Sequence, residues 1–282
     1  MWTLQPPKDI NHQEIIDVAL TYKNGDAKYT LTNDEKNAIS NICIQYDGLK
    51  GKEHDDLKGE EALRVASRTA MHDAYNEVQI KGRLSDYRSK LLFSALRCPC
   101  CGISAADELD HYLPRSQFNA LSLYSNNLIP MCHQCNNKKR THHSDTDERF
   151  LHAYFDNVPS NERFFIADTS ITNGALIVNF SAIKTPGITD EVLSMISFQI
   201  NLVRLNARLK KEINIFLTAF IDVIEMTYDV QESSDDVKKL LNGAERTFTN
   251  KFGLNDWRSA LLNSLSNNDR FCGGGVRIVF EK

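Results

Sequence analysis

Residues 98–101 read CPCC and residues 132–135 read CHQC, so two C-x2-C pairs lie close together in the chain. Two such pairs supply four thiolates, which is the tetrahedral set that structural Zn2+ prefers. Because residues 102–131 separate the pairs, a folded segment must lie between them. We therefore predict a structural zinc site whose ligands are Cys98, Cys101, Cys132 and Cys135.

The chain has seven cysteines in all, and five of them belong to this cluster. An odd, clustered set favours a metal site in a reducing compartment over a disulfide framework. Cys100 could replace Cys98 or Cys101 as a ligand, although C-x2-C geometry favours the outer two. The alternative, a set of buried free cysteines, would not explain two matched pairs. Cys43 lies on the apolar face of a predicted helix, so we expect it in the core, and we expect Cys272 to be either structural or incidental.

Polar residues in a fixed order surround the two cysteine pairs. Residues 110–114 read DHYLP, residues 126–130 read NNLIP and residues 136–140 read NNKKR. This order resembles the HNH, or ββα-metal, endonuclease family, whose members carry an Asp-His pair, an Asn-Leu pair and a Cys-x2-Cys-(His/Asn)-x2-Lys segment. The resemblance covers residues 94–143 and says little about the rest of the chain.

The residue types of the Asp-His pair suit phosphodiester hydrolysis. That reaction needs a base to activate water and a cation to stabilise charge on the phosphate and on the leaving oxygen. His111 is the natural base, because an imidazole pKa of about 6.5 leaves it largely neutral at cell pH. In an extended strand Asp110 points to the face opposite His111, so it can hold a divalent cation while the imidazole addresses the water.

The resemblance implies roles for the residues that follow. Asp110 and Asn136 would coordinate the catalytic metal, and Asn127 would orient the His111 imidazole or its loop. Lys139, with Lys138 and Arg140, would contact phosphate and supply local positive charge. The last letter of HNH stands for a histidine, and this chain has Asn136 at that position. Because an amide oxygen is a harder ligand than imidazole, Mg2+ or Mn2+ is favoured as the catalytic metal. The glycine pair common after the Asp-His segment is replaced by SQFNA at residues 116–120.

Elsewhere the apolar spacing is mostly helical. Asn173-Gly174, between two strand-like segments, is a strong hairpin signal. The expected helices cover residues 33–46, 59–78, 84–96, a long stretch over 189–226, and one capped by residues 233–236; the expected strands cover residues 163–172, 175–183 and, after a glycine turn, 276–280.

Together these patterns predict an α+β fold that is predominantly α-helical, with a ββα-metal zinc module flanked by helical segments and a small β-hairpin. We expect a helical region over 1–93, the nuclease module with its four-cysteine zinc site over 94–158, and a hairpin plus helical region over 159–282. The apolar helices of the last region could form either its core or a dimer face.

The composition sets limits on partners and location. The net charge of −4 argues against a generally basic nucleic-acid-binding protein, so binding must come from a local patch or a partner. The N-terminus lacks the apolar core of a secretory signal, and no apolar stretch is long enough to span a membrane. We therefore expect a cytoplasmic protein that targets its substrate through a partner or an oligomer.

The layout also resembles the HNH nuclease subunits of Septu-type bacterial anti-phage defence systems. The shared features are a helical N-terminal segment, the Cys-framed DHYLP module and FLHAYFD at residues 150–156. In such systems the nuclease works beside an ATPase, which the resemblance implies as a partner here.

Three functions remain after this reading. The first is a metal-dependent endonuclease that cuts DNA as the effector of a defence system. The second is a zinc-stabilised module that binds nucleic acid or protein without cleavage, although such a scaffold has no reason to assemble Asp110, His111 and Asn136. The third is an RNase that uses the same residues.

Overall fold

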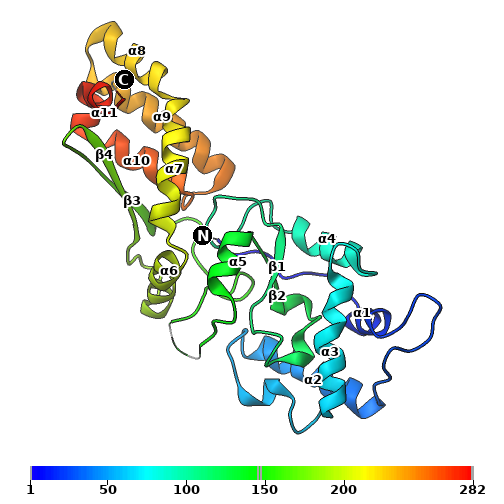
Figure 1. Cartoon of the computed structure of the whole chain (residues 1–282). Coiled ribbons are helices and arrows are strands. Elements are labelled where there is room, and N and C mark those ends of the chain that lie inside the picture. Colours follow the sequence, from blue (N-terminus) through cyan, green and yellow to red (C-terminus); the bar gives the residue numbers. More distant parts are fainter. Residues whose placement is uncertain (1, 145, 147, 281–282) are drawn as a thin grey trace. The chain divides into compact units, whose positions relative to one another are not determined.

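The computed structural model describes residues 2–144, 146 and 148–280. Contacts within the chain define two compact units, one over Thr3–Asn157 and one built mainly from Val158 onward, and each is described by itself (Figure 1). The N-terminal helices and the cysteine-framed segment belong to the same unit. Helices dominate both units, and each holds a small two-stranded antiparallel sheet, which confirms the predicted α+β class.

Four helices precede the cysteine pairs in the first unit. They are α1 (His12–Ala19), α2 (Asn33–Gly48), α3 (Val65–Ala74) and α4 (Ser85–Phe93), with short 3-10 turns at Asp55–Lys58 and Tyr75–Val78. The helix predicted over 33–46 is confirmed, and the side chains of Thr32 and Glu35 form a capping box at its start. The helix expected over 59–78 is shorter, because residues 59–64 form turns before α3 begins.

The ββα element consists of β1 (Glu108–His111), β2 (Leu128–Met131) and α5 (His133–Lys139). The strands are antiparallel, and His111 pairs with Leu128. Short 3-10 turns at Asn119–Leu121 and Ser125–Asn127 lie in the connection between the strands. α4 contacts both strands and α5 contacts β1, so the N-terminal helices support the module directly (Figure 1).

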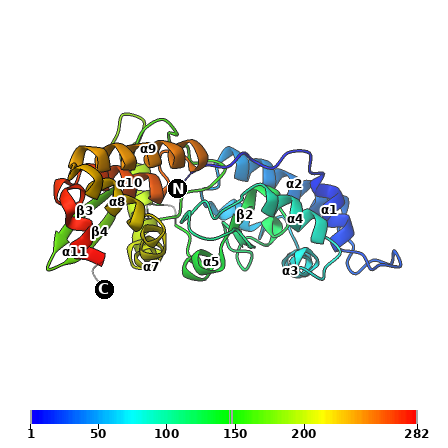
Figure 2. The same cartoon turned by 90° about the horizontal axis from the view of Figure 1, so that it is seen from above.

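The second unit begins with the predicted hairpin. β3 (Phe165–Thr172) and β4 (Ala175–Ala182) pair in register, and Asn173 and Gly174 both have positive φ, at 51° and 76°. Two left-handed residues match the type I′ turn that this dipeptide favours, so the hairpin is confirmed. The helices of the second unit are α6 (Asp190–Leu202), α7 (Leu205–Thr218), α8 (Ile221–Gln231), α9 (Ser234–Phe252), α10 (Trp257–Ser266) and α11 (Val276–Phe280). α10 packs on β3 and beside α9 (Figure 2).

Two expectations for the second unit were inexact. The long helical pattern over 189–226 is broken into α6, α7 and the start of α8, with Arg204 in the left-handed region at φ 51°. The predicted strand over 276–280 is wrong, because these residues form helix α11, which contacts α8. The strand preference of Val, Ile and Phe depends on the packing surroundings, and here the segment packs as a helix against α8 and β4.

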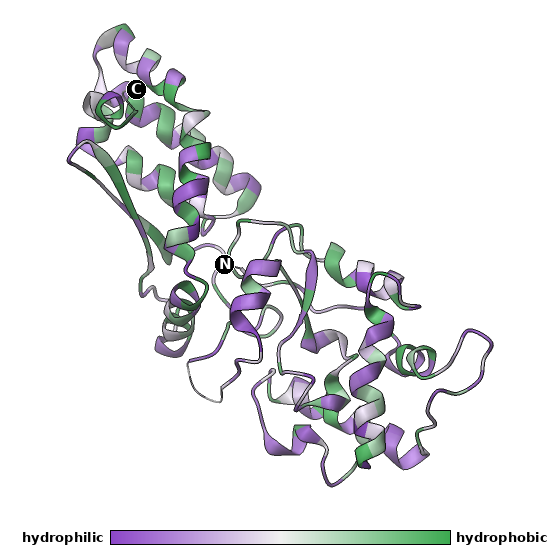
Figure 3. Ribbon diagram, in the orientation of Figure 1, coloured by the Kyte–Doolittle hydropathy of each residue, from purple (hydrophilic) through white to green (hydrophobic). Residues whose placement is uncertain are grey.

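Apolar residues of both units gather on the inner sides of the helices, and most helices carry polar and apolar faces together (Figure 3). Tyr46 of α2 and Leu57 are fully buried in the first unit, and Leu241 and Leu261 in the second. Among the described residues, no helix combines the length and apolar character needed to cross a membrane.

Candidate active site

The four predicted zinc ligands lie together. Cys98, Cys101, Cys132 and Cys135 are all buried, and their Sγ atoms lie within 4.8 Å of one another. The Sγ atoms of Cys101 and Cys132 are 3.7 Å apart. Zn–S bonds of about 2.3 Å place tetrahedral ligands about 3.8 Å apart, so this donor set fits Zn2+.

The remaining cysteines lie outside this cluster. Cys100 is buried beside it, and burial raises the pKa of its thiol well above the ordinary value. The group of Sγ atoms that lie close enough together to share one metal ion is that of Cys98, Cys101, Cys132 and Cys135, and it does not include Cys100. Cys43 and Cys272 are buried in the packing of their own units.

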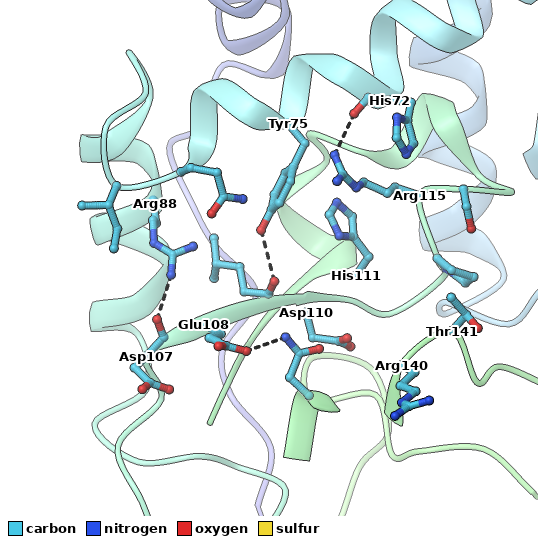
Figure 4. Close-up of a pocket in the computed structure, with 16 residues that line it drawn as sticks. His72, Tyr75, Arg88, Asp107, Glu108, Asp110, His111, Arg115, Arg140 and Thr141 are labelled. Carbon is cyan, nitrogen blue, oxygen red and sulfur yellow. Dashed lines mark hydrogen bonds between the residues drawn. The ribbon is translucent and has the colours of Figure 1, made fainter. Parts of the chain in front are cut away.

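A pocket of about 720 Å3 lies along β1, on the side of α3 and α4. The predicted site residues that line it are Asp110, His111, Asn136 and Arg140. Asn127, Lys138 and Lys139 do not line it. The opposite wall comes from the N-terminal helical segment, through residues such as His72 and Tyr75 (Figure 4). The cysteine-framed module therefore supplies only part of the site.

The His111 imidazole is held in one orientation. Its Nε2 lies 2.9 Å from the carbonyl oxygen of Ser122, and a carbonyl only accepts, so Nε2 carries the proton. Burial lowers the pKa of His111 to about 3, which keeps the ring neutral and leaves a lone pair on Nδ1. The Tyr75 ring packs edge-on against it, with 4.3 Å between the ring centroids. These contacts fix the orientation of the neutral imidazole.

Asp110 is buried beside Lys139, which the sequence analysis expected to contact phosphate instead. The Lys139 ammonium lies 2.9 Å from its Oδ2, and the two side chains are only 1% and 3% exposed. The same ammonium donates to the backbone carbonyls of His111 and Tyr112. Burial raises the pKa of Asp110 to about 6, and Lys139 acts in the opposite direction. Lys139 thus faces the interior of the module, whereas Lys138 and Arg140 are exposed.

Asn136 is the second oxygen donor next to β1. Its Nδ2 donates to the Glu108 carboxylate at 2.7 Å. No described residue bonds its Oδ1, and the side chain lines the same pocket as Asp110. A carboxylate and an amide oxygen are hard donors, so Asp110 and Asn136 fit Mg2+ or Mn2+ better than a softer metal.

Asn127 fixes the loop that carries the histidine rather than the imidazole itself. It is fully buried; its Oδ1 accepts from the backbone N–H of Leu113, and its Nδ2 donates to the carbonyls of Leu113 and Leu121. The Tyr46 hydroxyl of α2 donates to the same Oδ1 at 3.1 Å. The sequence analysis left open whether Asn127 orients the His111 imidazole or the loop after it. The hydrogen bonds of Asn127 hold the loop.

His152 extends this network. Its Nδ1 accepts from the backbone N–H of Tyr154, and burial lowers its pKa, so the neutral ring carries its proton on Nε2. That proton points to the Tyr46 oxygen at 2.8 Å. The bonds run in one direction, from His152 through Tyr46 to Asn127, and tie α2 to the loop after β1.

Cationic side chains border the pocket beside His111. The Arg115 guanidinium donates to the His72 carbonyl at 2.9 Å and lies over the Tyr75 ring (Figure 4). Arg88 is buried and donates to the carbonyl of Asp107. With the exposed Arg140, these groups place guanidinium cations around a pocket that also holds the carboxylates of Asp107, Glu108 and Asp110.

Sequence reasoning missed several residues of the site. Glu108 lies two residues before Asp110 in a strand, hence on the same face, and this alternation could have identified it. Arg115 directly follows the DHYLP segment but belongs to no part of the motif. Tyr46 and Tyr75 gave no signal, because only folding brings their helices to the module.

Comparison with known proteins agrees with this geometry. Residues 98–142 match the HNH endonuclease family. The chain is also similar to "Protein ea31" of Escherichia phage lambda, with 33% identity over 73 residues, which is 25% of this chain and 25% of that protein. The chain thus spans about a quarter of the length of this curated relative. No solved structure matches the chain.

Proposed function

We propose that this protein is a metal-dependent endonuclease that hydrolyses phosphodiester bonds in DNA. The match of residues 98–142 to the HNH endonucleases supports a nuclease of that type. The observation that carries the proposal is the His111 imidazole, neutral and fixed through Nε2, beside Asp110 and Asn136 in one pocket. A zinc scaffold that only binds has no use for this combination.

His111 acts as the general base. Its Nδ1 accepts a proton from water, and the resulting hydroxide forms the new bond to phosphorus as the bond to the leaving sugar oxygen breaks. The carbonyl of Ser122 keeps Nε2–H in place during this transfer. Asp110 and Asn136 would hold Mg2+ or Mn2+, which supplies positive charge for the phosphate and the leaving oxygen.

The pocket rim binds the nucleic acid backbone. Arg115 and Arg140 contact phosphates beside the reacting one, and Lys138 extends this patch on the exposed side of α5. Lys139 takes a different role from the one its position in the motif suggested. Its ammonium positions Asp110 and the backbone of β1 and does not face solvent.

Cleavage assays test this function. Zinc-loaded protein with Mg2+ or Mn2+ should nick supercoiled plasmid, and His111→Ala should lower the rate by about 10²–10⁴-fold, the usual contribution of a general base. Metal analysis should first show that the variant keeps its zinc. Single-stranded RNA in parallel distinguishes the RNase alternative. Binding without cleavage of either substrate, also in the presence of neighbouring gene products, would leave the zinc-binding module as the function.

We place this activity in anti-phage defence, beside an ATPase partner that selects the target. The support is the Septu-like layout of the sequence, together with a net charge of −4, which favours a partner that helps to bring the substrate to the pocket. Cells that carry the native operon should restrict phage, and His111→Ala should abolish restriction. Equal plaque counts with both proteins would contradict this role, and failure of an ATPase to co-purify would contradict the partner.

A further inference from the structure

Glu108 is a carboxylate at the site that the proposed chemistry does not use. It lies on β1, two residues before Asp110, and lines the same pocket. Its Oε2 accepts from Asn136 Nδ2 at 2.7 Å, and its Oε1 contacts His133 Nδ1 at 2.7 Å. Both carboxylate oxygens are therefore engaged by residues of α5.

The bond to Glu108 determines which atom of the Asn136 amide is available. An ionised carboxylate only accepts hydrogen bonds, so the amide must turn its NH2 group toward Glu108. Nδ2 and Oδ1 branch from the same carbon, so fixing the first directs the second away from Glu108. Without this bond the amide could turn by 180° and present its NH2 group, which repels a cation.

We propose that Glu108 is a positioning residue for the catalytic cation site, where it holds the Asn136 amide with Oδ1 ready to bind the metal. This inference rests on the proposed function, because it assigns Asn136 as a ligand of Mg2+ or Mn2+. Glu108 acts through Asn136 and does not bind the cation itself. Partners of this kind typically contribute 10–100-fold to metal affinity.

The contact with His133 strengthens the arrangement without being essential to it. The His133 side chain is 68% exposed, whereas that of Glu108 is 33% exposed. An exposed pair of this kind contributes little energy, so its loss should leave Glu108 bonded to Asn136. His133→Ala is therefore a matched control, since it removes one partner of the carboxylate and keeps the other.

Binding of Mn2+ to the zinc-loaded full chain, followed by electron paramagnetic resonance, tests the proposal without a cleavage readout. Glu108→Ala should weaken Mn2+ binding by about tenfold or more. Glu108→Gln should restore most of the affinity, because its amide oxygen still accepts from Asn136 Nδ2. His133→Ala should bind Mn2+ like the wild type. Circular dichroism and zinc content confirm that each variant is folded.

A double-mutant cycle gives the decisive comparison. In an Asn136→Ala background, Glu108→Ala should cause no further loss of affinity, because it acts only through the missing amide. The same loss in both backgrounds would overturn the proposal, as would wild-type affinity in Glu108→Ala. If Glu108→Gln and Glu108→Ala bind Mn2+ equally weakly, the negative charge of Glu108 itself attracts the cation, and this result would also overturn the proposal. A wild-type protein that neither binds Mn2+ nor cleaves nucleic acid would refute the proposed function as well.

Discussion

Replacing Lys139 by methionine tests the buried ion pair in the centre of the module. The Lys139 ammonium and the Asp110 carboxylate lie 2.9 Å apart, with side chains 1% and 3% exposed. Methionine fills similar space but leaves Asp110 without its cation, and it leaves the carbonyls of His111 and Tyr112 without a donor. Breaking a buried pair in this way costs about 3–5 kcal/mol.

Urea unfolding of the zinc-loaded protein measures this cost. Zinc release, followed with a chromogenic indicator, reports the Thr3–Asn157 unit separately from the rest of the chain. Lys138→Met is the matched control, because Lys138 is the exposed neighbour on the same helix, and surface changes usually alter stability by less than about 0.5 kcal/mol. A Lys139→Met protein as stable as the Lys138→Met protein would refute the burial of this ammonium.

Three further predictions concern the supports of the same unit. Removal of zinc by a chelator, or Cys132→Ser, should abolish the cooperative unfolding of this unit, because the thiolate cluster closes the module; an unchanged urea midpoint would contradict a structural zinc site. Tyr46→Phe should cost about 1–3 kcal/mol in the same urea titration, because it takes the Tyr46 oxygen from buried His152 Nε2 and leaves Asn127 Oδ1 with the backbone N–H of Leu113 alone; a neutral effect would exclude the network. The Arg64 guanidinium holds the pKa of Glu35 well below its usual range, so this pair stabilises the fold above pH 4 and its contribution is lost as the pH falls. Glu35→Gln should therefore reduce the fall in thermal midpoint between pH 6 and pH 3, and parallel curves for the two proteins would contradict it.

The sequence identified the parts of the site that depend on local spacing. The C-x2-C pairs predicted the four-cysteine cluster, because thiolates with two residues between them can reach one ion. The hairpin turn was equally predictable, since Asn173 and Gly174 tolerate positive φ. The strand with the Asp-His pair also forms where the motif places it.

Prediction from local sequence patterns was wrong where the position of a side chain or the conformation of a segment depends on residues far away in the chain. The sequence presented Lys139 as one cation in a basic run, and only folding brings it against Asp110. Residues 276–280 have the composition of a strand, but they form a helix that packs against α8 and β4 and does not join the β3–β4 sheet. Strand propensity reflects packing on a neighbouring strand, which the sequence of the segment does not encode.

The sequence by itself determined which groups this protein brings to its site: four thiolates at the spacing typical of a zinc site, and an acid, an imidazole and an amide in the order of the HNH motif. Only the tertiary structure decided how that chemistry is held. Tyr46 and Tyr75 come from helices far from the motif in the chain, yet they support the histidine and its loop. The physical reason is that metal ligands on one short segment follow from covalent spacing, whereas hydrogen bonds and burial depend on groups that meet only when the chain folds.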